Sequence, residues 1–171
     1  MICHSGGAIG SDTLFEDLCV KNNIEIRAYS YKTPYHKSPN KIEISETDFL
    51  EGIEKVKLAN KSLKRFGYQK YINLLARNWS QVKYSDAIFA VSSIKGNIVN
   101  GGTGWACQMG IDNGKTVYVF DQDISSWFKW SYISESFVKS PTPKITVENF
   151  AGIGTRNLNE NGVNAIKSLF G

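Results

Sequence analysis

The stretch that decides the fold is DAIFAV, Asp86–Val91, which is followed along the chain by the glycine-rich turn NGGTG, Asn100–Gly104. A second run of the same kind, KTVYVFD, covers Lys115–Asp121. Both runs are compact and rich in β-branched and aromatic residues, which is typical of strands buried in a parallel sheet. Strands of this kind, with glycine turns after them, predict an α/β fold.

Outward from these strands, short apolar runs alternate with helical patterns. The predicted elements are strands over Ile2–Ser5 and Ile24–Tyr31, and helices over Ser11–Asn23, from Ser45 onward and over Tyr71–Ser85. Ser45 and Asp48 have the spacing of a capping box, which supports a helix start there. The alternation predicts one α/β domain over residues 1–171, with a parallel sheet flanked by helices.

Two segments do not follow this alternation. KTPYHKSPN, Lys32–Asn40, contains Pro34 and Pro39 and predicts a loop that can lie as a flap over a site. The last quarter of the chain holds SSWFKW and the proline-containing KSPTPKITV, to which no element is assigned.

The composition indicates a folded protein without a nucleic-acid partner. Of its 171 residues, 42% are hydrophobic and 12% aromatic, which is enough to bury a core and excludes a disordered chain. The net charge of +4 is mild, whereas nucleic-acid readers carry a more clustered basic surface. The densest basic stretch, Lys61–Lys70, indicates a solvated helix face and its exit turn.

The cysteines favour a reducing compartment. Cys3, Cys19 and Cys107 are odd in number and lack the spacing of metal ligands, so we expect reduced, buried thiols in a cytoplasmic protein. The chain starts directly with MICHSGG, and no apolar run approaches ~18 residues, so neither a signal peptide nor a membrane span is expected.

Three glycine-rich turns are candidates for a binding site: Gly6–Gly10, Gly101–Gly104 and Gly152–Gly154. A glycine turn at a helix N-terminus offers unpaired N–H groups and close backbone approach to a phosphate. In a parallel sheet, ligands sit beyond the carboxyl ends of the strands. If the three turns converge there, they surround a ligand that carries phosphate and sugar groups.

Several side chains can complete such a site. Ser5 and Ser11 add hydroxyl donors, and Asp12 can accept a hydrogen bond from a ribose hydroxyl. Arg156, which directly follows AGIGT, is expected in the first turn of the last helix, where it can neutralise phosphate. Arg77 lies in the middle of a predicted helix, and the local pattern leaves its role open between a ligand contact and a solvated residue.

The residues for catalysis are harder to find. His4 and His36 are the only histidines, and neither has an evident nucleophile partner. His4 lies within the first predicted strand, which indicates a satisfied or partly buried residue rather than a base. The sequence contains no metal cluster, no P-loop and no serine elbow, and its tryptophans are expected in the core.

At this point the residues resemble a known family. RNWSQVKYSDAIFAV followed by NGGTGWACQ resembles the core of the Lonely Guy phosphoribohydrolases, which carry an arginine-bearing helix, a serine–aspartate–alanine strand and a PGGxGTxxE turn. Arg77 matches the arginine of that family, Ser85–Ala87 starts the matching strand, and Gly101, Gly102 and Gly104 match its glycines.

A second motif points to the same superfamily. SGGAIGSD, Ser5–Asp12, resembles the SGGAxGxD turn of the DNA-processing protein A (Smf) family, and both families belong to the Rossmann-like SLOG superfamily. In the usual SLOG order, a strand with a GxGSR-type turn and its helix come just before the SGGAxG strand. Here FAGIGTRNLNENGVNAIKSLF, Phe150–Phe170, follows at the end of the chain. The resemblance therefore implies a circularly permuted SLOG arrangement of the YpsA-related type, over about two thirds of the chain.

The resemblance also bears on catalysis. The last position of PGGxGTxxE is a glutamate that is important for cleaving the N-glycosidic bond, and the matching residue here is Gln108. Glutamine has no carboxylate to stabilise a developing oxocarbenium ion or to move a proton. The leading proline and the second threonine are also replaced, by Asn100 and Trp105. The hydrolysis is therefore not carried over, and no catalytic residue is assigned.

The expected function is binding without catalysis, by a cytoplasmic domain that needs no cofactor or metal. The resemblance implies a nucleotide-derived ligand, of the NAD/ADP-ribose or adenine-nucleotide type, either sensed in bacterial defence or sequestered as a phage anti-defence sponge. It also implies a homo-oligomer. The predicted binding residues are Ser5, Gly6, Gly7, Gly10, Ser11, Asp12, Arg77, Gly101, Gly102, Thr103, Gly104, Gln108, Gly152, Gly154, Thr155 and Arg156.

Two alternatives stay open. The first is an N-glycoside hydrolase or phosphoribohydrolase that uses another acid, either Asp12 or Glu16, since both follow the first glycine turn. Glu16 is expected on a solvated helix face, which counts against it. The second alternative is single-stranded DNA binding, which the weak basic balance disfavours.

Overall fold

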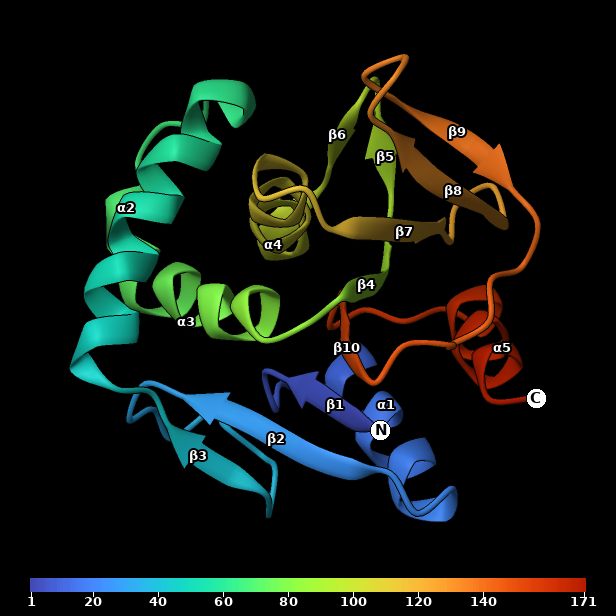
Figure 1. Cartoon of the computed structure of the whole chain (residues 1–171), viewed down its shortest axis with the longest axis horizontal. Helices are drawn as coiled ribbons and strands as arrows, with labels where there is room; N and C mark the ends of the chain where they lie inside the picture. The colour runs from blue at the N-terminus through green and yellow to red at the C-terminus, as the bar shows by residue number, and fades with distance from the viewer.

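The computed structural model describes residues 1–171 and is built around an eight-stranded sheet with the strand order β3-β2-β1-β10-β4-β7-β8-β9 (Figure 1). The strands are β1 (Ile2–Ser5), β2 (Glu25–Ser30), β3 (Lys41–Glu43), β4 (Ala87–Ser92), β7 (Thr116–Asp121), β8 (Ser126–Ser131), β9 (Ser136–Ser140) and β10 (Asn149–Gly154). The first six strands of this order are parallel to one another. β8 then pairs antiparallel with β7, and β9 pairs antiparallel with β8. A separate two-stranded ribbon consists of β5 (Ile94–Lys95) and β6 (Ile98–Val99). The expected α/β fold, Rossmann-like with a mostly parallel sheet flanked by helices, is confirmed.

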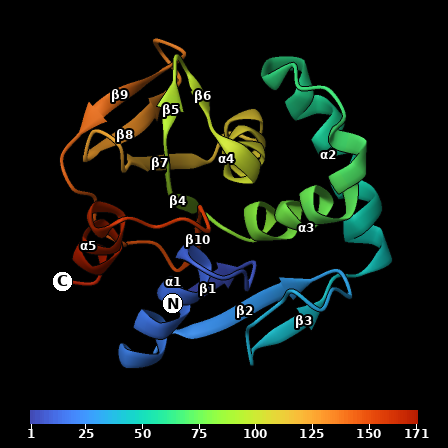
Figure 2. The same cartoon turned by 180° about the vertical axis from the view of Figure 1, so that it is seen from behind.

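Helices cover both faces of the sheet, as the two opposite views show (Figures 1 and 2). They are α1 (Ser11–Lys21), α2 (Glu46–Leu63), α3 (Ile72–Lys83), α4 (Gly101–Asp112) and α5 (Glu160–Leu169), with a short 3₁₀ helix η1 over Tyr68–Tyr71. One apolar cluster joins α1 and α5 to the sheet, and a second joins α3 and α4 to it. α2 packs on α3 and α4 rather than on the strands, and therefore forms an outer layer.

β4 lies at the centre of the core, and every one of its side chains is buried. Along AIFAVS, successive side chains point to opposite faces. Ile88 and Ala90 belong to the cluster with α3 and α4, whereas Phe89 and Val91 belong to the cluster with α1 and α5. An unbroken apolar run is therefore what this position requires, and the sequence has one.

The structure also contains elements that the sequence did not predict. SSWFKW and SFVKS form the hairpin β8–β9, which extends the sheet beyond β7 in the antiparallel sense. The loop Lys32–Asn40 contains no helix or strand, as predicted, and β3 follows it. The helix from Ser45 is confirmed with its cap, since the Ser45 hydroxyl accepts a hydrogen bond from the Asp48 N–H at 3.1 Å.

The two ends of the chain meet in the sheet. β10, from the last quarter of the sequence, lies parallel between β1 and β4, with Cys3 opposite Phe150. α5 follows β10 and packs on the same side of the sheet as α1. In space, β10, α5 and β1 have the arrangement of one strand–helix–strand unit, although no peptide bond joins α5 to β1. A permuted order of the SLOG type stays a prediction, with which this adjacency agrees.

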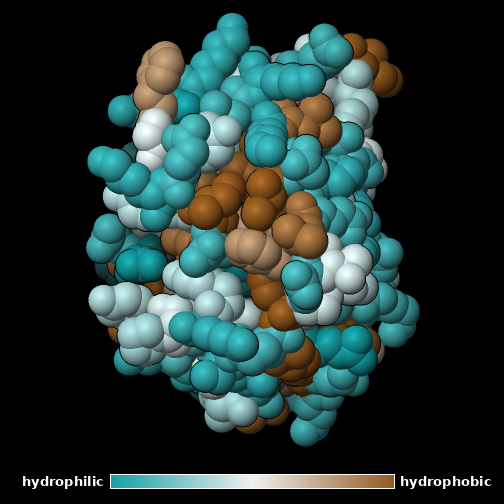
Figure 3. Space-filling model, turned by 90° about the vertical axis from the view of Figure 1, so that its left-hand side faces the viewer, coloured by the Kyte–Doolittle hydropathy of each residue, from teal (hydrophilic) through white to brown (hydrophobic).

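The outer helix α2 leaves apolar side chains uncovered. Its Leu50 is 55% exposed and its Leu58 is 40% exposed. Figure 3, which views the molecule from the α2 side, shows apolar atoms gathered in the middle of a mostly hydrophilic face. No helix is both long and apolar enough to cross a membrane.

Candidate ligand-binding site

A cavity of about 380 Å³ opens at the carboxyl edge of the sheet, where β1, β10, β4 and β7 end. Its lining consists of Ala8, Asp12, Leu74, Arg77, Asn78, Gln81, Ser92, Ser93, Asn100, Gly101, Gly102, Thr103, Gln122, Ile153, Gly154, Thr155, Arg156 and Asn157. All three glycine turns contribute to it, so they converge as predicted. Of the predicted binding residues, Asp12, Arg77, Gly101, Gly102, Thr103, Gly154, Thr155 and Arg156 line it.

The first and third turns touch one another. Gly10 has a φ of +100°, and a Cβ there would lie 2.7 Å from the Arg156 Cα, so only glycine fits between the two turns. Ser11 completes the junction, because its N–H and its hydroxyl both donate to the Thr155 carbonyl, at 3.2 and 2.8 Å. Thr155 in turn donates its N–H to the Val91 carbonyl of β4. Gly10 and Ser11 are therefore used to join the turns, and neither lines the cavity.

The second turn presents an uncapped helix N-terminus. Asn100 occupies the N-cap of α4, but its side chain makes no capping hydrogen bond and donates to the Ser93 hydroxyl instead. The Asn100 carbonyl accepts from the Ser92 hydroxyl, which fixes the turn against the end of β4. The N–H groups of the first helical turn, at Gly101–Thr103, therefore have no side-chain partner, and such groups bind anions readily.

Arg77 lies buried on α3, with only 5% of its surface exposed. Its guanidinium donates to the carbonyl oxygens of Gly6 and Tyr29, while its Nε–H has no partner in the protein. The solvated alternative for Arg77 is therefore wrong. The Arg77 guanidinium packs directly on Gly6, where a Cβ would overlap it. Gly6 therefore contacts Arg77 and does not line the cavity.

Asp12 is the only carboxylate that lines the cavity. It is 5% exposed, and its carboxylate accepts from the Ala8 N–H at 3.3 Å. Burial raises the pKa of this carboxyl to about 6, and the nearby Arg77 guanidinium opposes the rise. Near neutral pH, Asp12 is therefore mostly ionised, and the cavity holds two guanidinium groups against one carboxylate.

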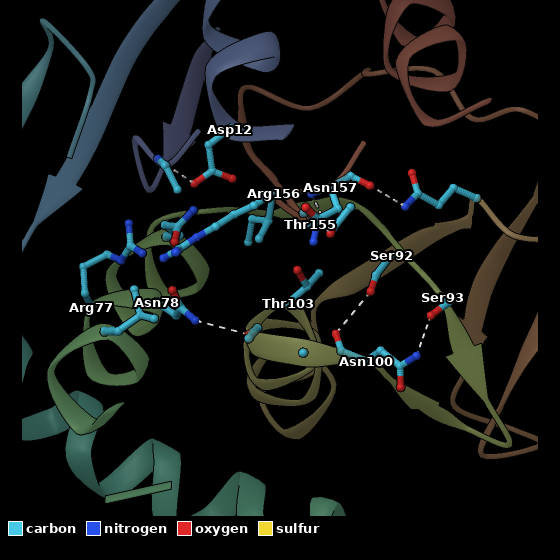
Figure 4. A pocket seen from close by; sticks show the side chains of 18 residues that line it. Asp12, Arg77, Asn78, Ser92, Ser93, Asn100, Thr103, Thr155, Arg156 and Asn157 are labelled. Atoms are coloured by element: carbon cyan, nitrogen blue, oxygen red, sulfur yellow. Dashed lines mark hydrogen bonds between the residues drawn. The ribbon is translucent and has the colours of Figure 1, made fainter. Parts of the chain in front are cut away.

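Arg156 is not in a helix, which corrects the expectation from the sequence. α5 begins only at Glu160, because Asn159 caps it by accepting from the Gly162 N–H at 2.9 Å. Arg156 is exposed and lies in the connection after β10, on the cavity wall. In Figure 4, Asp12, Arg77 and Arg156 lie on one side of the cavity, and Ser92, Ser93 and Asn100 lie on the other.

Sequence reasoning missed a row of neutral polar residues. Asn78 and Gln81 line the cavity from α3, together with Leu74 and Arg77. Their spacing is that of one helix face, on which Gln81 lies four residues after Arg77. The other residues that were not predicted are Ala8, Ser92, Ser93, Asn100, Gln122, Ile153 and Asn157, and each of them lies in the last two residues of a strand or within three residues after one.

Four further predicted residues lie outside the cavity. The Gln108 amide donates to the Asp112 carboxylate one turn later on α4, at 2.9 Å. Gly152 packs on the ring of Phe15, and Gly104 packs on the Val99 carbonyl. Ser5 donates to Glu16 at 2.5 Å. These residues support the elements around the cavity and are not placed to contact a ligand in it.

The loop Lys32–Asn40 closes over the first glycine turn. The His36 ring packs on Gly7, and the Lys37 N–H donates to the Gly7 carbonyl at 2.8 Å. His36 also donates its Nε2–H to the Tyr29 carbonyl at 3.1 Å, and its Nδ1 accepts from the Ser38 N–H at 3.3 Å. Neither ring nitrogen is therefore free to act as a base. The loop covers Gly7, and neither Gly7 nor any residue of the loop lines the cavity. The predicted flap therefore lies beside the cavity and not across it.

Glu16 is buried rather than solvated, which corrects a second expectation. It is 5% exposed, and its two carboxylate oxygens accept from the hydroxyls of Ser5 and Ser38. Burial raises the pKa of this carboxyl. Both oxygens are therefore engaged in holding the flap to β1. His4 is buried and hydrogen-bonded to Tyr29 and Asn149, as expected of a satisfied core histidine.

The basic stretch after α2 also has a structural role that the sequence did not indicate. Arg65 donates to the carbonyl oxygens of Gly101 and Val99, both at 2.7 Å, and lies over the ring of Trp105. It therefore anchors the turn that presents the N-terminus of α4. Trp105 and Trp127 are core residues, as expected.

The structure holds no group of three or more His, Cys, Asp or Glu side chains that could bind a metal ion. Comparisons with protein-family models, with curated proteins and with solved structures found no match.

Proposed function

We propose that this chain binds a nucleotide-derived ligand through its phosphate, in the cavity at the carboxyl edge of the sheet, and does not cleave it. One observation carries the proposal: the uncapped N-terminus of α4 shares a cavity with Arg77 and Arg156. Free backbone N–H groups, the positive end of a helix dipole and guanidinium groups are the partners that phosphate prefers.

The remaining lining supports a sugar beside the phosphate. Most of it consists of hydroxyl, amide and backbone groups, and only three lining residues are apolar. The more specific identity of the ligand, an NAD/ADP-ribose or adenine-nucleotide signal that is sensed or sequestered, is carried by the resemblance of the SGGAIGSD and NGGTGWACQ motifs. The identity of the ligand is therefore proposed from the motifs alone.

Calorimetry followed by mass spectrometry tests this function. The purified protein is titrated with NAD, ADP-ribose, cyclic ADP-ribose isomers, AMP and cyclic dinucleotides, and each mixture is then denatured and its small molecules identified. We expect at least one of these ligands to bind and to be recovered intact. The proposal is contradicted if none of these compounds binds. Release of a free base contradicts the claim that the ligand is not cleaved.

A second candidate, an N-glycoside hydrolase, is favoured by one observation. Asp12 lines the cavity, and its raised pKa, about 6, is close to the range in which a carboxyl group can transfer protons. Glu16 does not qualify, since it lies outside the cavity and both of its oxygens are engaged. If the base is released by the parent protein, Asp12→Asn abolishes the release under this second candidate.

A further inference from the structure

The cavity provides no surface for a nucleobase. None of its lining residues is aromatic, and its apolar residues are only Ala8, Leu74 and Ile153. Proteins that read a base stack it on aromatic or guanidinium planes and bind its edges, and the two guanidinium groups of this cavity are assigned to the phosphate. The volume of about 380 Å³ is near the lower end of the range for small-ligand pockets, which suits one end of a nucleotide better than a whole dinucleotide.

Gln81 is an unused polar group in this lining. It is 1% exposed, and its buried Nε2 donates to no acceptor in the protein. Arg77 lies four residues earlier on the same face of α3, and its buried Nε–H is also without a partner. Unpaired buried donors are unfavourable, and native proteins rarely keep them without a ligand or water to satisfy them.

The chemistry of these groups differs in a way that indicates their partners. A guanidinium donates only and suits an anionic oxygen, whereas a carboxamide both donates and accepts. A hydroxyl group also donates and accepts, so it matches Gln81. The ionised Asp12 accepts only, and it matches the donor side of a hydroxyl. The lining therefore combines phosphate-binding groups with groups that fit a polyhydroxylated sugar.

We propose that the cavity selects the phosphorylated ribose of its ligand, with Gln81 as the residue that reads a ribose hydroxyl, and leaves the base unread outside. This inference rests on the proposed function and names the part of the ligand that the site recognises. The ligand class is accordingly any compound that presents a ribose 5-phosphoryl unit at one end, whatever base it carries.

The experiment compares a panel of monophosphates by calorimetry, on the parent protein and on Gln81→Met, which keeps the length of the side chain and removes the amide. The panel contains AMP, GMP, CMP, UMP, 2′-deoxy-AMP, 3′-deoxy-AMP and ribose 5-phosphate. Gln69→Met is the matched control, because Gln69 is exposed on η1 and does not line the cavity.

The parent is expected to bind the four ribonucleotides within about threefold of one another, and to lose about tenfold on removal of one ribose hydroxyl. In Gln81→Met that tenfold preference disappears, while Gln69→Met keeps it. If the thermal unfolding of Gln81→Met shows that this variant does not fold, Gln81→Leu provides the same comparison, since it keeps most of the volume and removes both the donor and the acceptor of the amide.

If the monophosphates bind, two outcomes overturn the inference alone. One is a preference of tenfold or more among the four bases, and the other is an unchanged ribose preference in the folded Gln81 variants. A parent protein that binds no member of this panel, and none of the dinucleotide ligands, overturns the proposed function as well. Binding of dinucleotides without binding of any monophosphate or ribose 5-phosphate leaves the proposed function in place and overturns only the inference.

Discussion

At the scale of single residues, the two arginines of the cavity differ in what they do for the protein. Arg77 is buried and binds the carbonyl oxygens of Gly6 and Tyr29, so it holds the first turn as well as facing the cavity. Arg156 lies in an exposed connection on the cavity wall, and no hydrogen bond joins its side chain to the protein. Its charge is therefore available to a ligand.

This difference predicts that Arg156→Ala weakens ligand binding without weakening the fold. Loss of a charge-assisted contact to phosphate costs about 1.5 to 3 kcal/mol, which is on the order of a tenfold to hundredfold loss in affinity for ADP-ribose or AMP. Calorimetry measures the affinity and thermal unfolding measures the stability.

Arg27→Ala is the matched control, since Arg27 is exposed on β2 and pairs with Glu25 away from the cavity. Its affinity is expected to stay within about twofold of the parent. Equal affinities for Arg156→Ala and the parent contradict the assignment of Arg156.

Asp12 provides a prediction on stability. Its pKa is about 6 in the folded protein against 3.8 as the ordinary value, because the buried carboxylate is poorly solvated. The folded state therefore binds the Asp12 proton more tightly than the unfolded state, and ionisation destabilises the fold above pH 6. Asp12→Asn removes that charge, and at pH 8 it is expected to raise the free energy of unfolding by on the order of 1 to 3 kcal/mol.

The sign of the effect is checked by denaturant unfolding between pH 3.5 and 8. The gain from Asp12→Asn is fully present above pH 6 and diminishes as the pH falls toward 3.8, because the parent carboxyl is protonated in both states only below that pH. Asp17→Asn, on the exposed face of α1, is the control and is expected to show no such gain. A gain that grows toward acid pH contradicts this account.

At the scale of elements, α4 is the part on which the site depends most. Arg65 holds the turn before it by two hydrogen bonds to backbone carbonyls and by its position over Trp105. Arg65→Ala is expected to lower the free energy of unfolding by about 1 to 3 kcal/mol and to weaken binding of ADP-ribose, because the N-terminus of α4 loses its anchor.

Lys61→Ala is the comparison for this prediction, since Lys61 is exposed in the last turn of α2, just before Arg65, and makes no such contacts. Denaturant unfolding is expected to place Lys61→Ala within about 0.5 kcal/mol of the parent. The anchoring role is wrong if both variants unfold at the same denaturant concentration as the parent.

The elements also show what sequence patterns can and cannot predict. β4 and β7 were predicted because a strand buried on both faces must be apolar along its whole length. β8 and β9 were missed, since half-exposed strands at the edge of the sheet or next to it carry a weaker signal, as in SFVKS. In the site, the glycine turns and the arginines could be predicted from short sequence motifs. Which face of α3 lines the cavity is determined by how α2 and α4 pack around that helix. Asn78 and Gln81 therefore could not be assigned from the sequence.

At the scale of the whole molecule, the chain order predicts that the ends can be moved. β10 and α5 lie beside β1 and α1 as if they preceded them in the chain. We expect a rearranged chain, with residues 141–171 placed before residues 1–140 and joined by a flexible linker of roughly ten residues, to fold and to keep its affinity for ADP-ribose within about threefold. The new ends lie in the connection between β9 and β10.

Circular dichroism and calorimetry on the rearranged chain check this expectation. As a control, the same linker and new ends placed within β4 are expected to prevent folding, because β4 is buried at the centre of the sheet. A rearranged chain that opens in the β9–β10 connection and does not fold contradicts the adjacency of the two ends.

The central claim, that a nucleotide-derived ligand binds in the cavity at the uncapped end of α4, is tested most directly by two-dimensional ¹H–¹⁵N spectra recorded during a titration with ADP-ribose. If the ligand binds there, the largest shifts are expected at the amides of Gly101, Gly102 and Thr103, and at the side-chain N–H groups of Arg77 and Gln81. The amides of β8 and β9 are expected to keep their positions. A spectrum that does not change, or one in which the shifts gather on the β8–β9 hairpin and spare α4, contradicts this claim.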